Sequence, residues 1–229
     1  MQLHSPKQLA VLLLGLCLGN ALQAAPSAEP WAFWEPRSET SGAAVDHSLW
    51  QAILSKVVIN QADGSTAVRY SAFDATGKAQ LQQYVQQLTA MDPRTLARAE
   101  QMAYWINLYN ALTVQVVLDH PGKNSILRMG GGWLPRGPWD NPIASIAGQS
   151  LTLNDIEHRI LRPFWQDHRI HFAVNCASIG CPNLAAMAYT SDNLENMISS
   201  AEISFLNHPR ALQFIEQRLV LSSIFDWYM

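Results

Sequence analysis

The chain has 229 residues, of which 48% are hydrophobic and 14% charged, and its formal net charge at pH 7 is −3. A composition this apolar excludes an intrinsically disordered protein, and the length suits one folded domain. The small negative charge excludes a protein that binds nucleic acid through a basic surface, because such a surface must neutralise phosphates.

The first 24 residues have the features of a secretory signal peptide. Lys7 gives a positive start, residues 9–18 form an apolar run, and small residues follow at Ala24 and Ala25. The run is shorter than the roughly 20 apolar residues that span a bilayer, so we expect cleavage after Ala24 rather than anchoring. We therefore expect an exported, periplasmic protein in an oxidising compartment, with no transmembrane segment after cleavage.

Residues 25–46 are rich in Pro, Ser, Ala and Glu and lack a sustained period. This composition indicates a linker or extended arm, and we expect Trp31 and Trp34 to dock on the body of the protein. The folded domain is expected over residues 47–229.

Two helices are predicted in the first half of the domain, after a short strand over residues 67–70. Apolar residues at helical spacing predict helices over residues 78–91 and 100–118. Asp92 and Pro93 between them have the order of a helix cap and a first helical residue. The second helix has a wide apolar face, so we expect it to be the buried central helix.

A long loop over residues 129–142, with three successive glycines, Trp133 and Trp139, separates the halves of the domain. Long loops are often functional.

Shorter elements are predicted in the second half. Asn154 and Glu157 have the spacing of a capping box at a helix start, which gives Glu157 a structural role. The other expected elements are a hairpin over 143–147 and 150–153, a strand over 169–175, a helix over 191–206 and a strand over 218–221. Strands and helices do not alternate regularly. We predict a single α+β domain with a buried central helix packed on a small, mainly antiparallel sheet.

Four stretches, in this order, resemble the family called domain of unknown function 547. They are YWINLYNAL at 104–112, LTLNDIEHRILR at 151–162, RIHFAVNCASIGCP at 169–182 and IFDWY at 224–228. The resemblance covers nearly all of the chain after the arm. It implies a fold and no established activity or cofactor. Members of the family usually continue beyond the WY pair, so we expect the last helix to be shorter here.

Cys176 and Cys181 are the cysteines that follow the signal segment, with four residues between them. An even pair at close spacing in an exported protein predicts a structural disulfide. Closing so short a loop stabilises the fold by about 2 kcal/mol in the chain-entropy model. A catalytic or redox-active thiol is one alternative. A zinc site with His171 and His158 is another, but the spacing matches no standard zinc pattern, and we expect no metal.

A thiol enzyme requires a base near its nucleophile. Pro182 predicts the start of a short helix, which places Cys181 at a helix N-terminus, where the thiolate is favoured. His171 on the predicted strand is the nearest base. In a continuous strand His171 and Cys176 point to opposite faces, so Cys181 reaches His171 only if the loop between them folds back. The order of these residues resembles circularly permuted papain- or transglutaminase-like thiol hydrolases.

Asn107 and Asn110 lie three residues apart on the predicted central helix and share a face. A buried amide needs hydrogen bonds, so we interpret the pair as a clamp to a neighbouring loop. The functional alternative is that Asn107 orients His171 or donates to a bound carbonyl. In that case we expect Asn107, His171 and residues 176–181 to converge on one concave site, with residues 130–139 at its rim.

Two functions fit this sequence. The first is a non-catalytic binding module with a structural disulfide, whose partner is an unknown small molecule, peptide or envelope protein. The second is a thiol-dependent hydrolase or acyl-transferase acting on a peptide or cell-envelope substrate, with Cys176 or Cys181 as nucleophile, His171 as base and Asn107 as orienting residue. Neither requires a cofactor. The sequence favours the binding module, because each proposed catalytic residue has an adequate structural explanation.

Overall fold

The computed structural model describes residues 28–131, 136–222 and 224–227. The predicted signal segment, Trp133 and Tyr228 lie outside the described residues. The α-helices are α1 (Ser48–Val57), α2 (Ala75–Thr89), α3 (Arg98–Asp119), α4 (Arg162–Trp165), α5 (Ile170–Ala173), α6 (Leu194–Leu206) and α7 (Ile224–Trp227). Short 3-10 helices are η1 (Ala32–Trp34), η2 (Tyr70–Ala72), η3 (Pro93–Thr95) and η4 (Ile126–Arg128), and η5 (Asp155–Leu161) is a π-helix.

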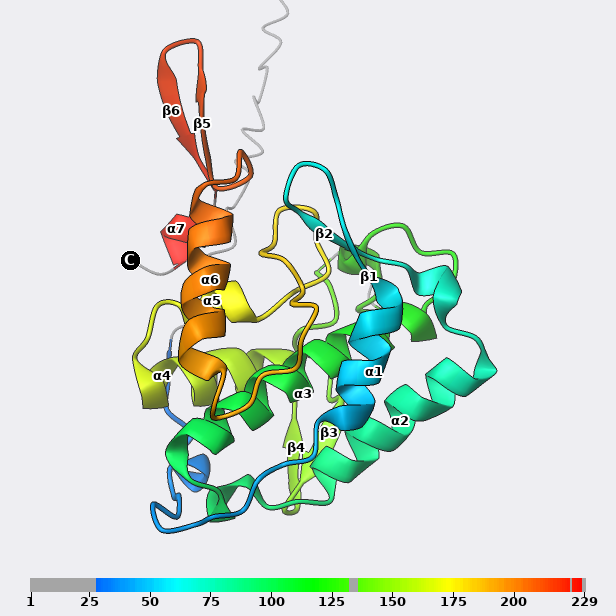
Figure 1. The fold of residues 1–229 in the computed structure, drawn as a ribbon, viewed down its shortest axis with the longest axis vertical. Helices are drawn as coiled ribbons and strands as arrows, with labels where there is room; N and C mark the ends of the chain where they lie inside the picture. The colour runs from blue at the N-terminus through cyan, green and yellow to red at the C-terminus, as the bar shows by residue number, and fades with distance from the viewer. Residues whose placement is uncertain (1–27, 132–135, 223, 228–229) are drawn as a thin grey trace, which may run out of the picture.

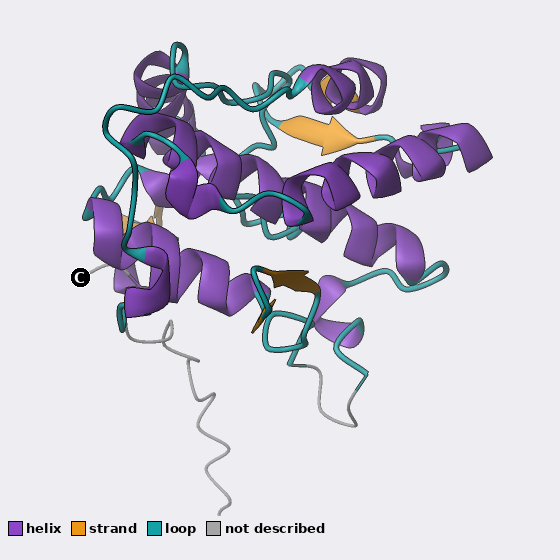
Figure 2. Cartoon of the chain, turned by 90° about the horizontal axis from the view of Figure 1, so that it is seen from below, coloured by secondary structure: helices purple, strands orange, loops and turns teal. Residues whose placement is uncertain are grey.

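The strands of the described residues pair only as antiparallel hairpins. They are β1 (Val58–Asn60) with β2 (Thr66–Val68), β3 (Ala144–Ile146) with β4 (Gln149–Leu151), and β5 (Leu212–Ile215) with β6 (Arg218–Leu221). Helices make up most of the body, with the hairpins around them (Figure 2). The predicted α+β domain is confirmed, and its sheet consists of these separate hairpins.

Helix α3 is the centre of the domain (Figure 1). Every residue from Glu100 to Val114 is buried, because other parts of the chain cover the helix on all sides. Helices α2 and η5 pack against it. It ends close to the predicted position, where the His120 ring lies 2.8 Å from the Val116 carbonyl oxygen and Gly122 adopts a φ of +80°.

The arm before α1 is packed on the body. Trp34 is fully buried and meets Trp105 edge-on at 5.2 Å between ring centroids. The carboxylate of Glu100 accepts the backbone N–H of Val45 at 2.6 Å. Part of the segment predicted as a linker therefore belongs to the core.

The predicted strand over residues 169–175 is wrong. Residues 170–173 form the helical turn α5, and Val174 after it is extended. All four residues of the turn are buried, because α6 packs against this segment and Asn110 of α3 donates to the Ala173 carbonyl. Among the described residues no strand pairs with this segment. The alternation of Ile170 and Phe172 was therefore a coincidence of spacing and no sign of a strand.

The predicted capping box is also wrong, by two residues. Asn154 makes no side-chain cap hydrogen bond. Thr152 donates to Asp155 Oδ2 from its backbone N–H at 2.9 Å and from its hydroxyl at 2.8 Å, and the Asp155 N–H donates back to the hydroxyl at 3.0 Å. Thr152 and Asp155 therefore form the box, in place of the expected Asn154 and Glu157.

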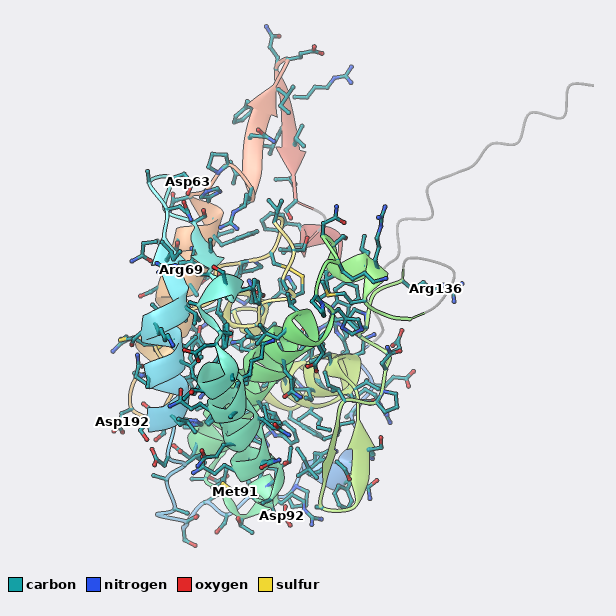
Figure 3. The ribbon with its side chains drawn as sticks, turned by 90° about the vertical axis from the view of Figure 1, so that its right-hand side faces the viewer. Asp63, Arg69, Met91, Asp92, Arg136 and Asp192 are labelled. Atoms are coloured by element: carbon teal, nitrogen blue, oxygen red, sulfur yellow. A yellow bond between two sulfur atoms is a disulfide. The ribbon has the colours of Figure 1, made fainter. Side chains whose placement is uncertain are left out.

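The β5–β6 hairpin, which we call the ribbon (residues 212–221), stands away from the body in Figure 1. Its side chains project into open space in Figure 3. Every residue of both strands is exposed. A two-residue turn joins the strands, and both turn residues have positive φ, 50° at Glu216 and 62° at Gln217, as in a type I′ turn.

Candidate functional site

The two asparagines of α3 are clamps. The Asn107 amide donates to the Tyr189 carbonyl at 2.7 Å and accepts the Tyr189 N–H at 3.0 Å. Asn110 donates to the Ala173 carbonyl at 2.9 Å and accepts the Asn175 N–H at 2.8 Å. Each amide therefore fixes the backbone of one loop to the central helix, and both hydrogen-bonding ends of Asn107 are engaged in that role.

The cysteines are joined to each other. Cys176 and Cys181 form a disulfide with 6.1 Å between their Cα atoms. The loop that they close is held from both sides, because Asn175 donates to the Pro182 carbonyl at 2.7 Å and Arg210 donates to the Cys181 carbonyl at 2.9 Å. Arg210 also binds Asn183 Oδ1 at 2.7 Å. In this state neither sulfur is a thiol, so neither is available as a nucleophile or a zinc ligand.

A buried cluster of Tyr109, Glu157 and His171, which we call the acid–base cluster, connects α3, η5 and α5. Glu157 Oε1 lies 3.1 Å from His171 Nδ1, and the Tyr109 hydroxyl also hydrogen-bonds the Glu157 carboxylate. Only 8% of the Glu157 side chain and 7% of the His171 side chain are exposed. The cluster therefore holds a carboxylate and an imidazole together in a largely dry environment.

The hydrogen positions of this cluster follow from its chemistry. A carboxylate accepts hydrogen bonds and does not donate, so Nδ1 of His171 carries the hydrogen in its contact with Glu157. Burial raises the pKa of Tyr109 well above its usual range, and the charge of Glu157 raises it further, so the phenol stays protonated. A carboxylate that fixes an imidazole in this way orients the general base in many hydrolases.

His158 is buried beside the cluster. It follows Glu157 in the π-helix η5, a type of turn that is frequent at functional sites. Arg162 donates from Nη1 to His158 Nδ1 at 2.9 Å, which places the ring hydrogen on Nε2. Burial lowers the pKa of His158, and although the Glu157 charge opposes this shift, the Arg162 charge adds to it. His158 is therefore neutral near pH 7.

The loop over residues 130–139 meets the cluster at one end. The Trp139 side chain hydrogen-bonds Tyr109, and the Trp139 carbonyl accepts the Asn154 N–H at 3.0 Å. Gly130 and Gly137 pass so close together that a Cβ on Gly130 would lie 1.9 Å from the Gly137 carbonyl oxygen. Arg136, labelled in Figure 3, lies on the outer side of this loop. The glycines thus allow the close packing that brings Trp139 to Tyr109.

The structure groups the predicted site residues differently from the sequence analysis. His171 contacts Glu157, the cysteines contact each other, and the Asn107 amide contacts Tyr189. The sequence analysis missed Tyr109, which lies within the predicted central helix, and Glu157, which we assigned to a cap. The signal that could have corrected the second error is Thr152, three residues before Asp155.

Two kinds of feature are absent from the described residues. No group of three or more His, Cys, Asp or Glu side chains in this part of the chain could hold a metal ion. None of the helices described has the length and apolar character needed to cross a membrane.

A family model described as a protein of unknown function, DUF547, matches residues 93–206. This range contains α3, η5, α5 and the disulfide loop, and it ends with α6, before the ribbon. No curated protein and no solved structure matches the chain.

Proposed function

The chain belongs to the DUF547 family, whose description assigns no activity, and we propose that it is a protein-binding module that presents the ribbon to a partner protein. The acid–base cluster and the asparagine clamps stabilise the body that carries the ribbon. The disulfide fixes the base of the ribbon.

The observation that carries this proposal is the apolar face of the ribbon. Leu212 pairs with Leu221, and Phe214 pairs with Leu219. Paired residues of antiparallel strands point to the same side, and so do alternate residues of one strand, so these four side chains form one face without a polar group. Their exposed fractions are 39% for Leu212, 75% for Phe214, 52% for Leu219 and 51% for Leu221. An isolated two-stranded hairpin is at best marginally stable in water, so this face favours a covering partner.

The disulfide loop supports the base of the ribbon. Arg210 lies two residues before β5 and donates to the carbonyls of Ile179 and Cys181, at 3.3 and 2.9 Å. Because the disulfide fixes the shape of the loop that carries these carbonyls, it also fixes the direction in which the ribbon leaves the body.

Export fits this role. The predicted signal segment would deliver the chain to the periplasm, an oxidising compartment in which Cys176 and Cys181 stay bonded. The ribbon would then be presented to proteins of the cell envelope.

The test places a photo-reactive amino acid at position 214 of the full chain in its source cells. We expect irradiation to join it to one partner protein. The matched control has the same amino acid at Ile203, an exposed apolar residue of α6 with 61% exposure, and should give no such product. The same product from both positions, or none from position 214, would contradict the proposal.

A second candidate function rests on the contact between Glu157 and His171. A carboxylate-oriented imidazole would suit a thiol-dependent hydrolase or acyl-transferase, with Cys176 or Cys181 as nucleophile and His171 as base. This function requires an external dithiol reductant, which supplies two electrons and two protons to cleave the disulfide into two thiols. Asn107 would have no direct role, because its amide holds Tyr189.

Thiol chemistry tests this second candidate. After mild reduction, alkylation of a catalytic cysteine should be fast at neutral pH, and His171→Gln should slow it by roughly tenfold or more. Equal alkylation rates in the two proteins would exclude His171 as the activating base.

A further inference from the structure

The disulfide loop (residues 176–181) contains a strained backbone position. Ala177 has a φ of +57°, in the left-handed region that is unfavourable for a residue with a Cβ atom. Glycine adopts this conformation without strain, but the glycine of the same loop, Gly180, is not at the left-handed position. The loop therefore holds backbone strain directly beside Cys176, one end of the disulfide.

Bonds within the loop keep Ala177 in this conformation. Its N–H donates to Asn175 Oδ1 at 2.9 Å, and the Cys181 N–H donates to the Ser178 carbonyl at 3.0 Å. The disulfide adds a covalent link between Cys176 and Cys181 across the loop. A strained residue persists only where its surroundings fix it. Cleavage of the S–S bond would let Ala177 relax, so the strain favours the reduced form.

The disulfide is accessible from one side. Cys176 is half-buried, whereas Cys181 is buried. Residues 178–180 at the tip of the loop are exposed, and 91% of Ile179 is accessible to solvent. Strained or exposed disulfides are reduced more readily than structural ones. A thiol of another molecule therefore has a path to the disulfide from the Cys176 side.

Arg210 connects the disulfide loop to the ribbon. It lies two residues before β5 and donates to the carbonyls of Ile179 and Cys181, at 3.3 and 2.9 Å. Its third acceptor, Asn183 Oδ1 at 2.7 Å, follows the loop. Two of these three acceptors belong to the segment that reduction would free. The state of the disulfide therefore affects how firmly the base of the ribbon is held.

We propose that the Cys176–Cys181 disulfide is a reversible redox site, which a dithiol reduces, and that reduction loosens the base of the ribbon. One thiolate of the dithiol attacks Cys176 Sγ, which forms a mixed disulfide and releases Cys181 as a thiolate. The second thiol of the dithiol then closes its own disulfide and releases Cys176. The dithiol loses two electrons and two protons, and the cysteine pair gains them as two thiols. Without a dithiol the pair stays oxidised. This site goes beyond the proposed binding function, because it requires no partner on the ribbon.

The first test measures the thiol–disulfide equilibrium of the folded full chain in mixtures of reduced and oxidised dithiothreitol. Alkylation and intact mass give the fraction reduced. We expect complete conversion to two thiols with unchanged helical circular dichroism. Ala177→Gly relieves the strain, so half conversion should require a roughly threefold higher ratio of reduced to oxidised dithiothreitol. The matched control Ala186→Gly, at an exposed position outside the loop, should leave this ratio unchanged.

Two results of this test would overturn the proposal. They are the same ratio for Ala177→Gly and the original chain, and conversion that occurs only after the helices have unfolded. The rate of reduction by thioredoxin, compared with dithiothreitol at equal thiol concentration, distinguishes a protein dithiol from a small one. Reduction by either supports the redox site, and reduction by neither contradicts it.

The second test measures amide exchange at the base of the ribbon, where the Ser222 N–H donates to the Ala211 carbonyl. Reduction should accelerate exchange of this amide at least tenfold, with exchange in α3 unchanged. Cys176→Ser combined with Cys181→Ser should give the same fast exchange without reductant. In Arg210→Gln the amide should exchange fast in both redox states. Equal exchange in the oxidised and reduced original chain would refute the connection between the redox site and the ribbon.

Discussion

Replacing Asn107 with Ala decides whether this amide is a structural clamp or part of a reactive site. The side chain is fully buried and satisfies both backbone groups of Tyr189, which is itself buried. Each buried polar group that loses its partner destabilises the fold by roughly 1–3 kcal/mol. Two groups give about 2–6 kcal/mol, and we expect about 3 kcal/mol, because water that enters the vacated space would partly satisfy them.

Urea unfolding of the oxidised protein measures this change. The matched control is Asn196→Ala, an exposed position of α6, which should alter the free energy of unfolding by less than about 0.5 kcal/mol. Amide hydrogen exchange at Tyr189 should also accelerate in the Asn107 variant, because its N–H has lost its acceptor. An unchanged free energy of unfolding, with unchanged exchange at Tyr189, would refute the clamp.

Three other changes test single features of the structure. Thr152→Ala should lower the free energy of unfolding by about 1 kcal/mol, whereas Asn154→Ala should leave it nearly unchanged, and equal effects in urea unfolding would contradict the revised capping box. The folded-state pKa of His158 is depressed, so its contribution to stability is present above the unfolded pKa of about 6.5 and is lost as the pH falls through the folded value. The free energy of unfolding should therefore decline less between pH 7.5 and pH 5.5 in His158→Gln than in the original protein. Parallel declines in the two proteins would rule this out. Glu216→Asn combined with Gln217→Gly should slow amide exchange in the ribbon, because Asn and Gly adopt positive φ more readily, and faster exchange would argue against a type I′ turn.

The sequence predicted best the elements whose pattern was long or local. The central helix was clear because an apolar face repeated through five turns, and it lies within two residues of the predicted bounds at each end. The β3–β4 hairpin followed from two short apolar runs around Gly148, which has a φ of +78°. The pairing of Cys176 with Cys181 followed from their number and spacing.

The candidate site was harder to predict, because its residues depend on contacts between distant segments. Glu157 looked like a capping residue, and only the pairing of Thr152 with Asp155 shows that its carboxylate is available to His171. Tyr109 looked like any aromatic residue of a buried helix until η5 was placed beside it. The expected placement of Asn107 and His171 in one shared site stays a prediction.

The amino-acid sequence by itself determined the domain class, the buried central helix, the β3–β4 hairpin and the cysteine pair, because these depend on apolar periodicity, turn residues and short separations along the chain. Only the tertiary structure decided that residues 170–173 form a helical turn, that Glu157 meets His171, and that the ribbon is exposed on both of its faces. The physical reason is that burial on all sides removes the periodicity that distinguishes a strand from a helix. Hydrogen bonds between segments far apart in sequence likewise leave no local pattern.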